Sequence, residues 1–287
     1  MCDINKAGVE RMDFSNPILI KEMRSRMRGK RAFLVLTGYV VTLSLIISLI
    51  YIVLHKNAPT TVVNQAGSVL TPVLIYVQMG LICLIAPTFS ASAISSEREQ
   101  QTFDLLIASL AQPSTILFGK VGAALSYLFL TLFGSLPLIA LTYSLGGVAL
   151  RDIAIAYLVM IVSGVTFCSM SFLWSTMIRR GVLAQLTSLI AVIFLVAAMP
   201  ALALFFSALA GNFNGPPSQA FMNIVFLLLR TNPFAAIASQ IPGIPIPANV
   251  WLHNVPVWVT QVIFYLLLTA ASLLLSLRRL QQVRSWI

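Results

Sequence analysis

Long apolar stretches separated by short polar segments make up most of the chain. Each of six stretches is long enough to cross a bilayer core as a helix, which takes about 20 residues. They are predicted at about 33–54, 69–94, 116–142, 152–177, 182–210 and 257–277. The pattern predicts an all-α, polytopic membrane protein with six transmembrane helices, in which residues 1–287 form a single transmembrane domain.

A seventh apolar segment, at 218–231, has a core too short to cross the bilayer unaided. We predict a short interfacial or re-entrant helix here, within an external loop that spans residues 211–256. The helix should end near Asn232-Pro233, because the residue before a proline disfavours helical backbone. If the segment did cross, the arginines at the C-terminal end would lie outside the cell.

The composition excludes a soluble globular protein of this size. Of the 287 residues, 59% are hydrophobic and only 9% are charged, whereas soluble domains carry about 25% charged residues. The formal net charge of +10 could suggest nucleic acid as a partner. However, the basic residues flank the apolar runs, and this placement favours contact with lipid headgroups. We therefore expect no nucleic-acid partner.

The basic residues divide unequally between the two sides of the membrane. Only Lys56, Arg151 and Arg230 fall in the loops of one side, and the other fifteen of the 18 lysines and arginines fall on the opposite side. Because basic residues are retained in the cytoplasm, the N- and C-termini are predicted to be cytoplasmic. We expect a multi-pass protein of a prokaryotic plasma membrane, the cell inner membrane.

The segment before the first span has the features of an interfacial helix. Asn16 suits an N-cap and Pro17 suits the first helical position. An apolar stripe runs between basic residues and consists of Leu19, Ile20, Met23 and Met27. Residues 1–32 are therefore predicted to form a cytoplasmic tail and a helix in the headgroup region. The alternative is an ordinary basic flank that only enforces topology.

The loop at 95–115, after the second span, is the second distinctive cytoplasmic segment. Ser96 and Glu99 have the spacing of a capping box. An apolar face at helical spacing follows and consists of Phe103, Leu106, Ile107 and Leu110. We predict a short amphipathic helix that starts at Ser96, ends before Pro113 and docks on a soluble partner. The alternative is a helix that packs only on its own bundle.

The two cytoplasmic segments together resemble the ABC-2 type family of ABC transporter permeases. That family opens with an elbow helix of the form Asn-Pro-x-x-x-Lys-Glu-x-Arg. The matching residues here are Asn16, Pro17, Lys21, Glu22 and Arg24. After its second span the family carries Gly-Glu-Arg-Glu-x-Gly-Thr-hydrophobic-Asp/Glu-Leu-Leu, then a proline and a Gly-Lys pair. The matching residues here are Glu97, Arg98, Glu99, Thr102, Phe103, Asp104, Leu105 and Leu106, with Pro113, Gly119 and Lys120.

The resemblance departs from the family pattern at two positions, where Ser96 and Gln101 replace glycines. It also extends to Asn232-Pro233-Phe234, which is similar to a recurring element of the family's late external region. The resemblance implies two permease subunits, as a homodimer or a heterodimer, paired with two cytoplasmic ATPase subunits. It further implies that the segment from Ser96 to Leu106 is the coupling element that senses ATP binding and hydrolysis.

The chain lacks the residues needed to hydrolyse ATP itself. Gly119-Lys120 is followed by Val121 and has no upstream glycine at the spacing of a phosphate-binding loop. We therefore expect no enzymatic activity and no cofactor in this chain, with ATP bound by the partner subunit. The leading hypothesis is an exporter subunit. The alternative is a membrane scaffold or assembly factor that docks a cytoplasmic partner without transporting anything.

Acidic residues and histidines are missing from the predicted membrane core. The two histidines, His55 and His253, lie in external loops, and all eight acidic residues lie outside the membrane core. This distribution argues against an ion-coupled secondary transporter, which places such groups at depth. It also argues against an intramembrane protease, and the three cysteines have no metal-ligand spacing.

A few polar and small residues inside the spans are candidates for the transport pathway or for helix packing. In the second span, Gln78 and Pro87 suit a kinked helix that faces a pathway, although a purely structural role is the alternative. In the fourth span, small residues recur on one face, namely Gly164, Cys168, Ser171 and Ser175. Such a face predicts close helix packing rather than a substrate-lining role.

Overall fold

The computed structural model describes residues 30–57, 66–91, 93–101, 113–198, 200–202, 205–206, 208, 219–241 and 255–284. These residues contain helices and no strand. In chain order the helices are α2 (Lys30–Asn57), α4 (Gly67–Ser90), α5 (Ser95–Glu99), α7 (Pro113–Ser144), α8 (Leu150–Met177), α9 (Gly181–Ile193), the π-helix η1 (Phe194–Ala198), α11 (Gln219–Arg230), α12 (Pro233–Ala238) and α13 (Val257–Arg284).

Six of the described helical segments are long and apolar enough to cross a membrane. They are Phe33–Lys56, Gly67–Glu99, Ser114–Ser144, Leu150–Met177, Gly181–Leu202 and Val257–Gln282. Each overlaps one of the predicted spans, which confirms the all-α, polytopic fold class. A helix is the expected form for these sequences, because in lipid each backbone N–H and C=O must be satisfied within the segment.

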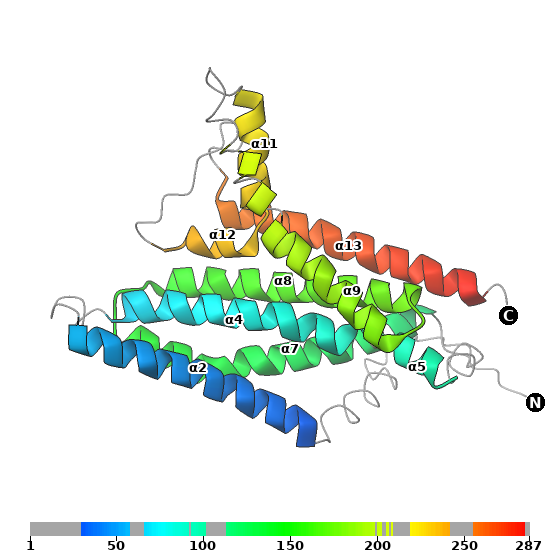
Figure 1. The fold of residues 1–287 in the computed structure, drawn as a ribbon, viewed down its shortest axis with the longest axis horizontal. Helices are drawn as coiled ribbons and strands as arrows, with labels where there is room; N and C mark the ends of the chain where they lie inside the picture. Colours follow the sequence, from blue (N-terminus) through cyan, green and yellow to red (C-terminus); the bar gives the residue numbers. More distant parts are fainter. Residues whose placement is uncertain are drawn as a thin grey trace, which may run out of the picture.

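The helix α8 is the centre of the bundle. It packs against α4, α7, α9 and α13, and Figure 1 shows it running alongside α4 on one side and α13 on the other, with α9 crossing obliquely. Its side chains at Val159, Met160 and Phe167 are completely buried. By contrast, α2 and α9 expose many large apolar side chains, as expected for helices that face lipid or another subunit.

The small residues of α8 allow its neighbours to approach closely. A Cβ atom added at Gly164 would run into the Leu128 side chain of α7. Further along, the Ser90 hydroxyl of α4 donates to the Cys168 carbonyl over 2.7 Å. The prediction of close helix packing on this face is therefore confirmed.

Hydrogen bonds between buried side chains join α8 to α13. Gln261 Nε2 donates to Ser163 Oγ over 2.9 Å. One turn further along, the Thr166 and Thr269 hydroxyls lie 2.9 Å apart. Such bonds hold helices together where lipid offers polar groups no alternative partner.

The segment between the fifth and sixth spans forms two short helices. The helix α11 ends at Arg230, as predicted, because Asn232 has the extended backbone (ψ 129°) that its following proline favours. The Asn232 side chain accepts from Phe234 N over 2.7 Å and donates to the Val196 carbonyl over 2.6 Å. Asn232 therefore caps α12 and also ties it to the end of the fifth span. Figure 1 shows α11 projecting away from the bundle.

Two glycines of α4 provide a matched test of packing at the start of this span. A Cβ at Gly67 would run into the carbonyl oxygens of Thr142 and Gly146, which are backbone atoms at the end of α7. We expect Gly67→Ala to lower the free energy of unfolding by about 1–3 kcal/mol, the usual cost of overpacking. Equilibrium unfolding in mixed micelles measures this change.

The control is Gly80→Ala, in the interior of the same helix, where an added Cβ meets nothing within 4 Å. Because alanine is the better helix former, this variant should gain about 0.5–1 kcal/mol. Equal stabilities for the two variants would contradict the close contact between α4 and the end of α7.

Candidate functional site

The segment between the second and third spans begins with a helix of only five residues, α5 (Ser95–Glu99). The predicted continuous helix from Ser96 toward Pro113 is wrong, because α5 ends at Glu99 and Gln101 has a positive φ of 57°. That left-handed backbone disfavours side chains other than glycine. The resemblance places a glycine at this position. The residues Thr102, Phe103, Asp104, Leu105 and Leu106 lie outside the described part of the chain.

The acidic residue of the expected capping box has a different partner. The N-cap of α5 is Ile94, without a side-chain cap, so the prediction that Ser96 and Glu99 cap this helix is wrong. Instead, Glu99 Oε1 accepts a hydrogen bond of 2.9 Å from Gly181 N, the first residue of α9. A carboxylate is stabilised there by the helix dipole and by an N–H that has no partner within the helix.

The glycine at the start of α9 allows this approach. A Cβ at residue 181 would lie 3.2 Å from Glu99 Oε2 and 3.7 Å from Ser95 Oγ. Contacts of 3.2 Å are tighter than an ordinary van der Waals contact, so a larger residue would push Glu99 away. Gly181 and Glu99 together therefore fix α5 against the start of the fifth span.

The start of α5 is held by the fourth span. Ser175 Oγ, near the end of α8, accepts hydrogen bonds from Ile94 N over 2.9 Å and from Ser95 N over 3.1 Å. These are two of the N–H groups that a helix start leaves without partners. Ser175 thus performs the capping role that Ser96 was expected to perform, but from another helix.

A buried ion pair joins α5 to the third span. Lys120 Nζ lies 2.7 Å from Glu97 Oε1 and donates to the Ala93 carbonyl over 2.9 Å. The Lys120 side chain is 2% exposed, whereas that of Glu97 is 23% exposed. An ammonium group buried to this extent without a carboxylate would be strongly unfavourable. The pair therefore fixes α5 on α7.

The sequence identified Glu97 and Lys120 as residues of one family motif but did not predict that they form an ion pair. The available signal was a lysine at the edge of an otherwise apolar stretch, which needs a partner once that stretch enters the bilayer. Three contacts, through Glu97, Glu99 and Ser175, thus clamp α5 to α7, α9 and α8. A force applied to α5 would be transmitted to all three spans.

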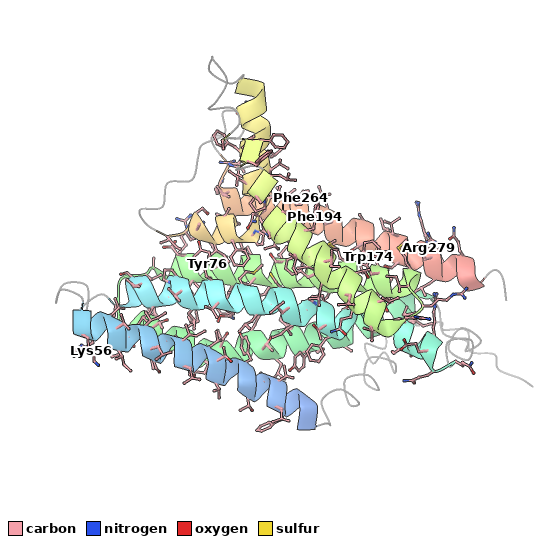
Figure 2. All side chains as sticks on the ribbon, in the orientation of Figure 1. Lys56, Tyr76, Trp174, Phe194, Phe264 and Arg279 are labelled. Carbon is pink, nitrogen blue, oxygen red and sulfur yellow. The ribbon has the colours of Figure 1, made fainter. Side chains whose placement is uncertain are left out.

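The exposed side of α5 is polar, and positively charged side chains lie close to it. Glu99, Gln100 and Gln101 are exposed, and Arg98 is half-buried. The positive charges of Arg98 and Arg179 are close enough to interact. Exposed arginines also stand at the end of α13, where Figure 2 labels Arg279. This end of the bundle thus presents a short polar helix beside a basic surface.

The remaining predicted site residues lie elsewhere. Gln78 is completely buried and donates from Nε2 to Ser135 Oγ over 2.7 Å, and that hydroxyl lies 2.9 Å from the Tyr157 hydroxyl. Pro87 is buried within α4. Both residues sit inside the bundle of this one chain, and a role in the transport pathway stays a prediction. The elbow residues Asn16, Pro17, Lys21, Glu22 and Arg24 lie outside the described residues.

The ion pair between Lys120 and Glu97 can be tested with a double-mutant cycle. We expect Glu97→Gln to lower the free energy of unfolding by about 2–3 kcal/mol, because it leaves the buried ammonium without a carboxylate. Lys120→Met should cost less, about 1 kcal/mol, since Glu97 is partly exposed and water can solvate it. The double variant should recover most of the loss. Additive losses in the cycle would show that the two side chains do not interact.

Comparison with known proteins agrees with this architecture. A sequence model described as ABC-2 family transporter protein matches residues 16–283, which include the elbow segment, the clamped α5 and Asn232-Pro233-Phe234. No curated protein matches the chain significantly. The family match confirms the resemblance and explains the six spans without a phosphate-binding loop. The chain therefore belongs to the ABC-2 family of transporter proteins and is a permease subunit of an ABC transporter.

Proposed function

We propose that this chain is the membrane-spanning subunit of an exporter that moves its substrate with energy from ATP hydrolysed by a separate cytoplasmic ATPase. The observation that carries the proposal is the clamp on α5. One short element at the end of the bundle is bonded to three spans through Lys120–Glu97, Glu99–Gly181 and Ser175. An ATPase that moved against α5 would displace α7, α8 and α9 together.

The roles within this segment divide between docking and positioning. Glu97 and Glu99 direct carboxylate oxygens to Lys120 and Gly181, so they are positioning residues. Ser96, Arg98 and the residues Thr102, Phe103, Asp104, Leu105 and Leu106 form the docking side in our proposal. The elbow helix, with Asn16 and Pro17, would move in the headgroup plane as the bundle rearranges.

The direction of transport and the assembly are also part of the proposal. A second permease subunit, identical or related, would complete the translocation pathway, as the exposed apolar faces of α2 and α9 allow. At the end opposite α5, the described residues form α11, α12 and short connections rather than a domain that could dock an external binding protein. Export is the direction that this arrangement favours.

Docking can be tested by copurification with a candidate ABC ATPase from the same organism. We expect the double variant Arg98→Glu, Phe103→Ala to reduce copurification and stimulated ATPase activity at least tenfold, because it reverses a charge and removes an apolar anchor on the docking side. Arg279→Glu, a charge reversal at the same end but on α13, serves as the control and should keep both. Unchanged association of the double variant would refute the docking role.

Substrate-stimulated ATP hydrolysis distinguishes a positioning role of Glu97 and Lys120 from a docking role. It also distinguishes a transporter from a scaffold. In proteoliposomes, the double variant Glu97→Gln, Lys120→Met should still bind the ATPase but lose substrate-stimulated ATP hydrolysis, because α5 is no longer bonded to α7. A scaffold would show no substrate-stimulated hydrolysis with the native sequence either.

The orientation of the bundle follows from the same proposal. The α5 end carries Arg98, Arg179 and Arg180, and the opposite end carries Lys56 and Arg151, so the α5 end should be cytoplasmic. In a background without Cys2, Cys83 and Cys168, a membrane-impermeant maleimide should label Ser144→Cys in intact cells. It should label Gln100→Cys only after permeabilisation. Both positions are exposed, so labelling of Gln100→Cys in intact cells and of Ser144→Cys only after permeabilisation would contradict this orientation.

A further inference from the structure

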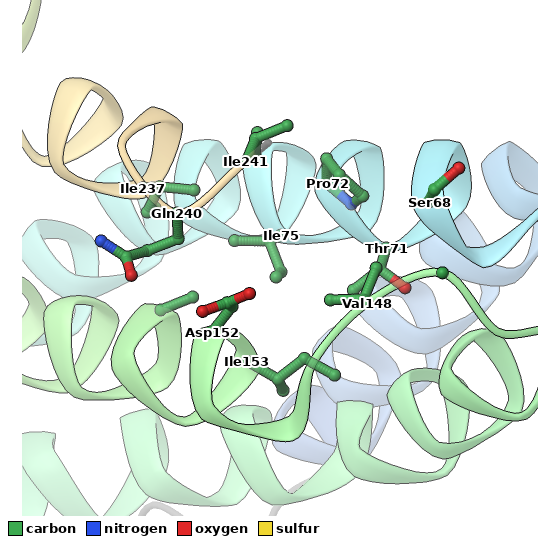
Figure 3. Close-up of a pocket in the computed structure, with 12 residues that line it drawn as sticks. Ser68, Thr71, Pro72, Ile75, Val148, Asp152, Ile153, Ile237, Gln240 and Ile241 are labelled. Atoms are coloured by element: carbon green, nitrogen blue, oxygen red, sulfur yellow. The ribbon is translucent and has the colours of Figure 1, made fainter. Parts of the chain in front are cut away.

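A cavity of about 310 Å³ opens at the end of the bundle opposite α5. It lies between the start of α4, the turn from α7 to α8, the first turns of α8, and α12 (Figure 3). The turn contains Gly146 and Gly147 at φ values of 76° and 92°, which glycine adopts without strain. The volume is at the lower end of the range for sites that hold small organic molecules.

Most of the wall is apolar. Ile75 of α4, Ile153 of α8 and Ile237 of α12 line the cavity from three sides. All three side chains are buried, so they form a fixed surface. A wall of branched aliphatic side chains favours a ligand with an apolar body.

A single carboxylate supplies the charge of the cavity. Asp152 lies in the first turn of α8 and is half-buried, and its carboxylate makes no hydrogen bond or ion pair with another described residue. No basic side chain lines the cavity among the residues that the structure describes. Figure 3 shows the Asp152 carboxylate and the Gln240 amide turned toward the space between α8 and α12.

We propose that this cavity binds an amphiphilic organic ammonium ion. The ammonium group pairs with Asp152, and the apolar body lies along Ile75, Ile153 and Ile237. A metal ion fits poorly, since Ca²⁺ takes six to eight oxygen ligands and the cavity offers one carboxylate. A soluble amine and the ethanolamine headgroup of a lipid share the required chemistry. The site is independent of the proposed export and would exist equally in a scaffold.

The probe for this site is 4-fluorophenethylamine, which is a cation at neutral pH. Binding is followed by fluorine NMR with the full chain in nanodiscs of phosphatidylglycerol. We expect saturable binding, and binding of the neutral 4-fluorophenethyl alcohol at least about tenfold weaker, as the loss of a charge-assisted hydrogen bond predicts. Failure to bind the amine, or equal affinities for amine and alcohol, would overturn the proposal.

Two variants assign the binding to the cavity. Asp152→Asn should weaken amine binding about tenfold. Arg151→Gln is the control, because Arg151 is the exposed neighbour of Asp152 and does not line the cavity. It should bind at least as well as the native chain. Thermal unfolding verifies that each variant is folded, and native affinity in Asp152→Asn would place the amine elsewhere.

Nanodiscs that contain phosphatidylethanolamine identify the source of the ammonium group. If the lipid headgroup occupies the cavity, this lipid should raise the apparent dissociation constant for the amine in the native chain and leave that of Asp152→Asn unchanged. If the native chain binds the amine equally in both lipids, the ligand is a soluble amine.

Discussion

The structure depends on one constraint, that polar groups carried into a bilayer-spanning bundle must find partners inside the protein. The helix α8 meets most of this demand. Its Ser163 and Thr166 bond to α13, its Cys168 carbonyl accepts from Ser90 of α4, and its Ser175 caps α5. Each of these bonds also needs small side chains so that the backbones approach closely. The same residues therefore provide both the close packing and the specificity of the bundle.

The bonds that clamp α5 follow from this constraint and link α5 to three of the spans. The Lys120 ammonium is buried near the start of α7 and requires the Glu97 carboxylate, which brings α5 back onto α7. At α9 a second carboxylate holds α5 in place, since Glu99 accepts a hydrogen bond from Gly181 N at the start of that helix. The short helix α5 is thus bonded to three spans, so a displacement of α5 would also displace them. The opposite end is built differently, with the Asp152 carboxylate left facing a cavity.

Sequence reasoning was most successful where one local rule decides the structure. The number and nature of the spans follow from apolar length, and the end of α11 before Pro233 follows from the backbone restriction before proline. The prediction of a capping box was wrong, although Ser96 and Glu99 have the spacing that such a box requires. The N–H groups of Ile94 and Ser95 and the carboxylate of Glu99 all have partners on other helices, and no local pattern contains that information. Gln101 shows the same limit, since it takes a positive φ without being glycine.

The amino-acid sequence by itself determined that this chain is a helical membrane protein, and its motifs pointed to the ABC-2 family, which the family match confirmed. Apolar length, loop charge and short motifs are local properties, and each can be read without knowing which helices touch. Only the tertiary structure decided that Lys120 pairs with Glu97, that Glu99 caps α9, and that Ile237 and Asp152 share one cavity. These pairings join residues from different helices. They arise because burial removes water as a partner, and the identity of the replacement partner depends on how the helices pack.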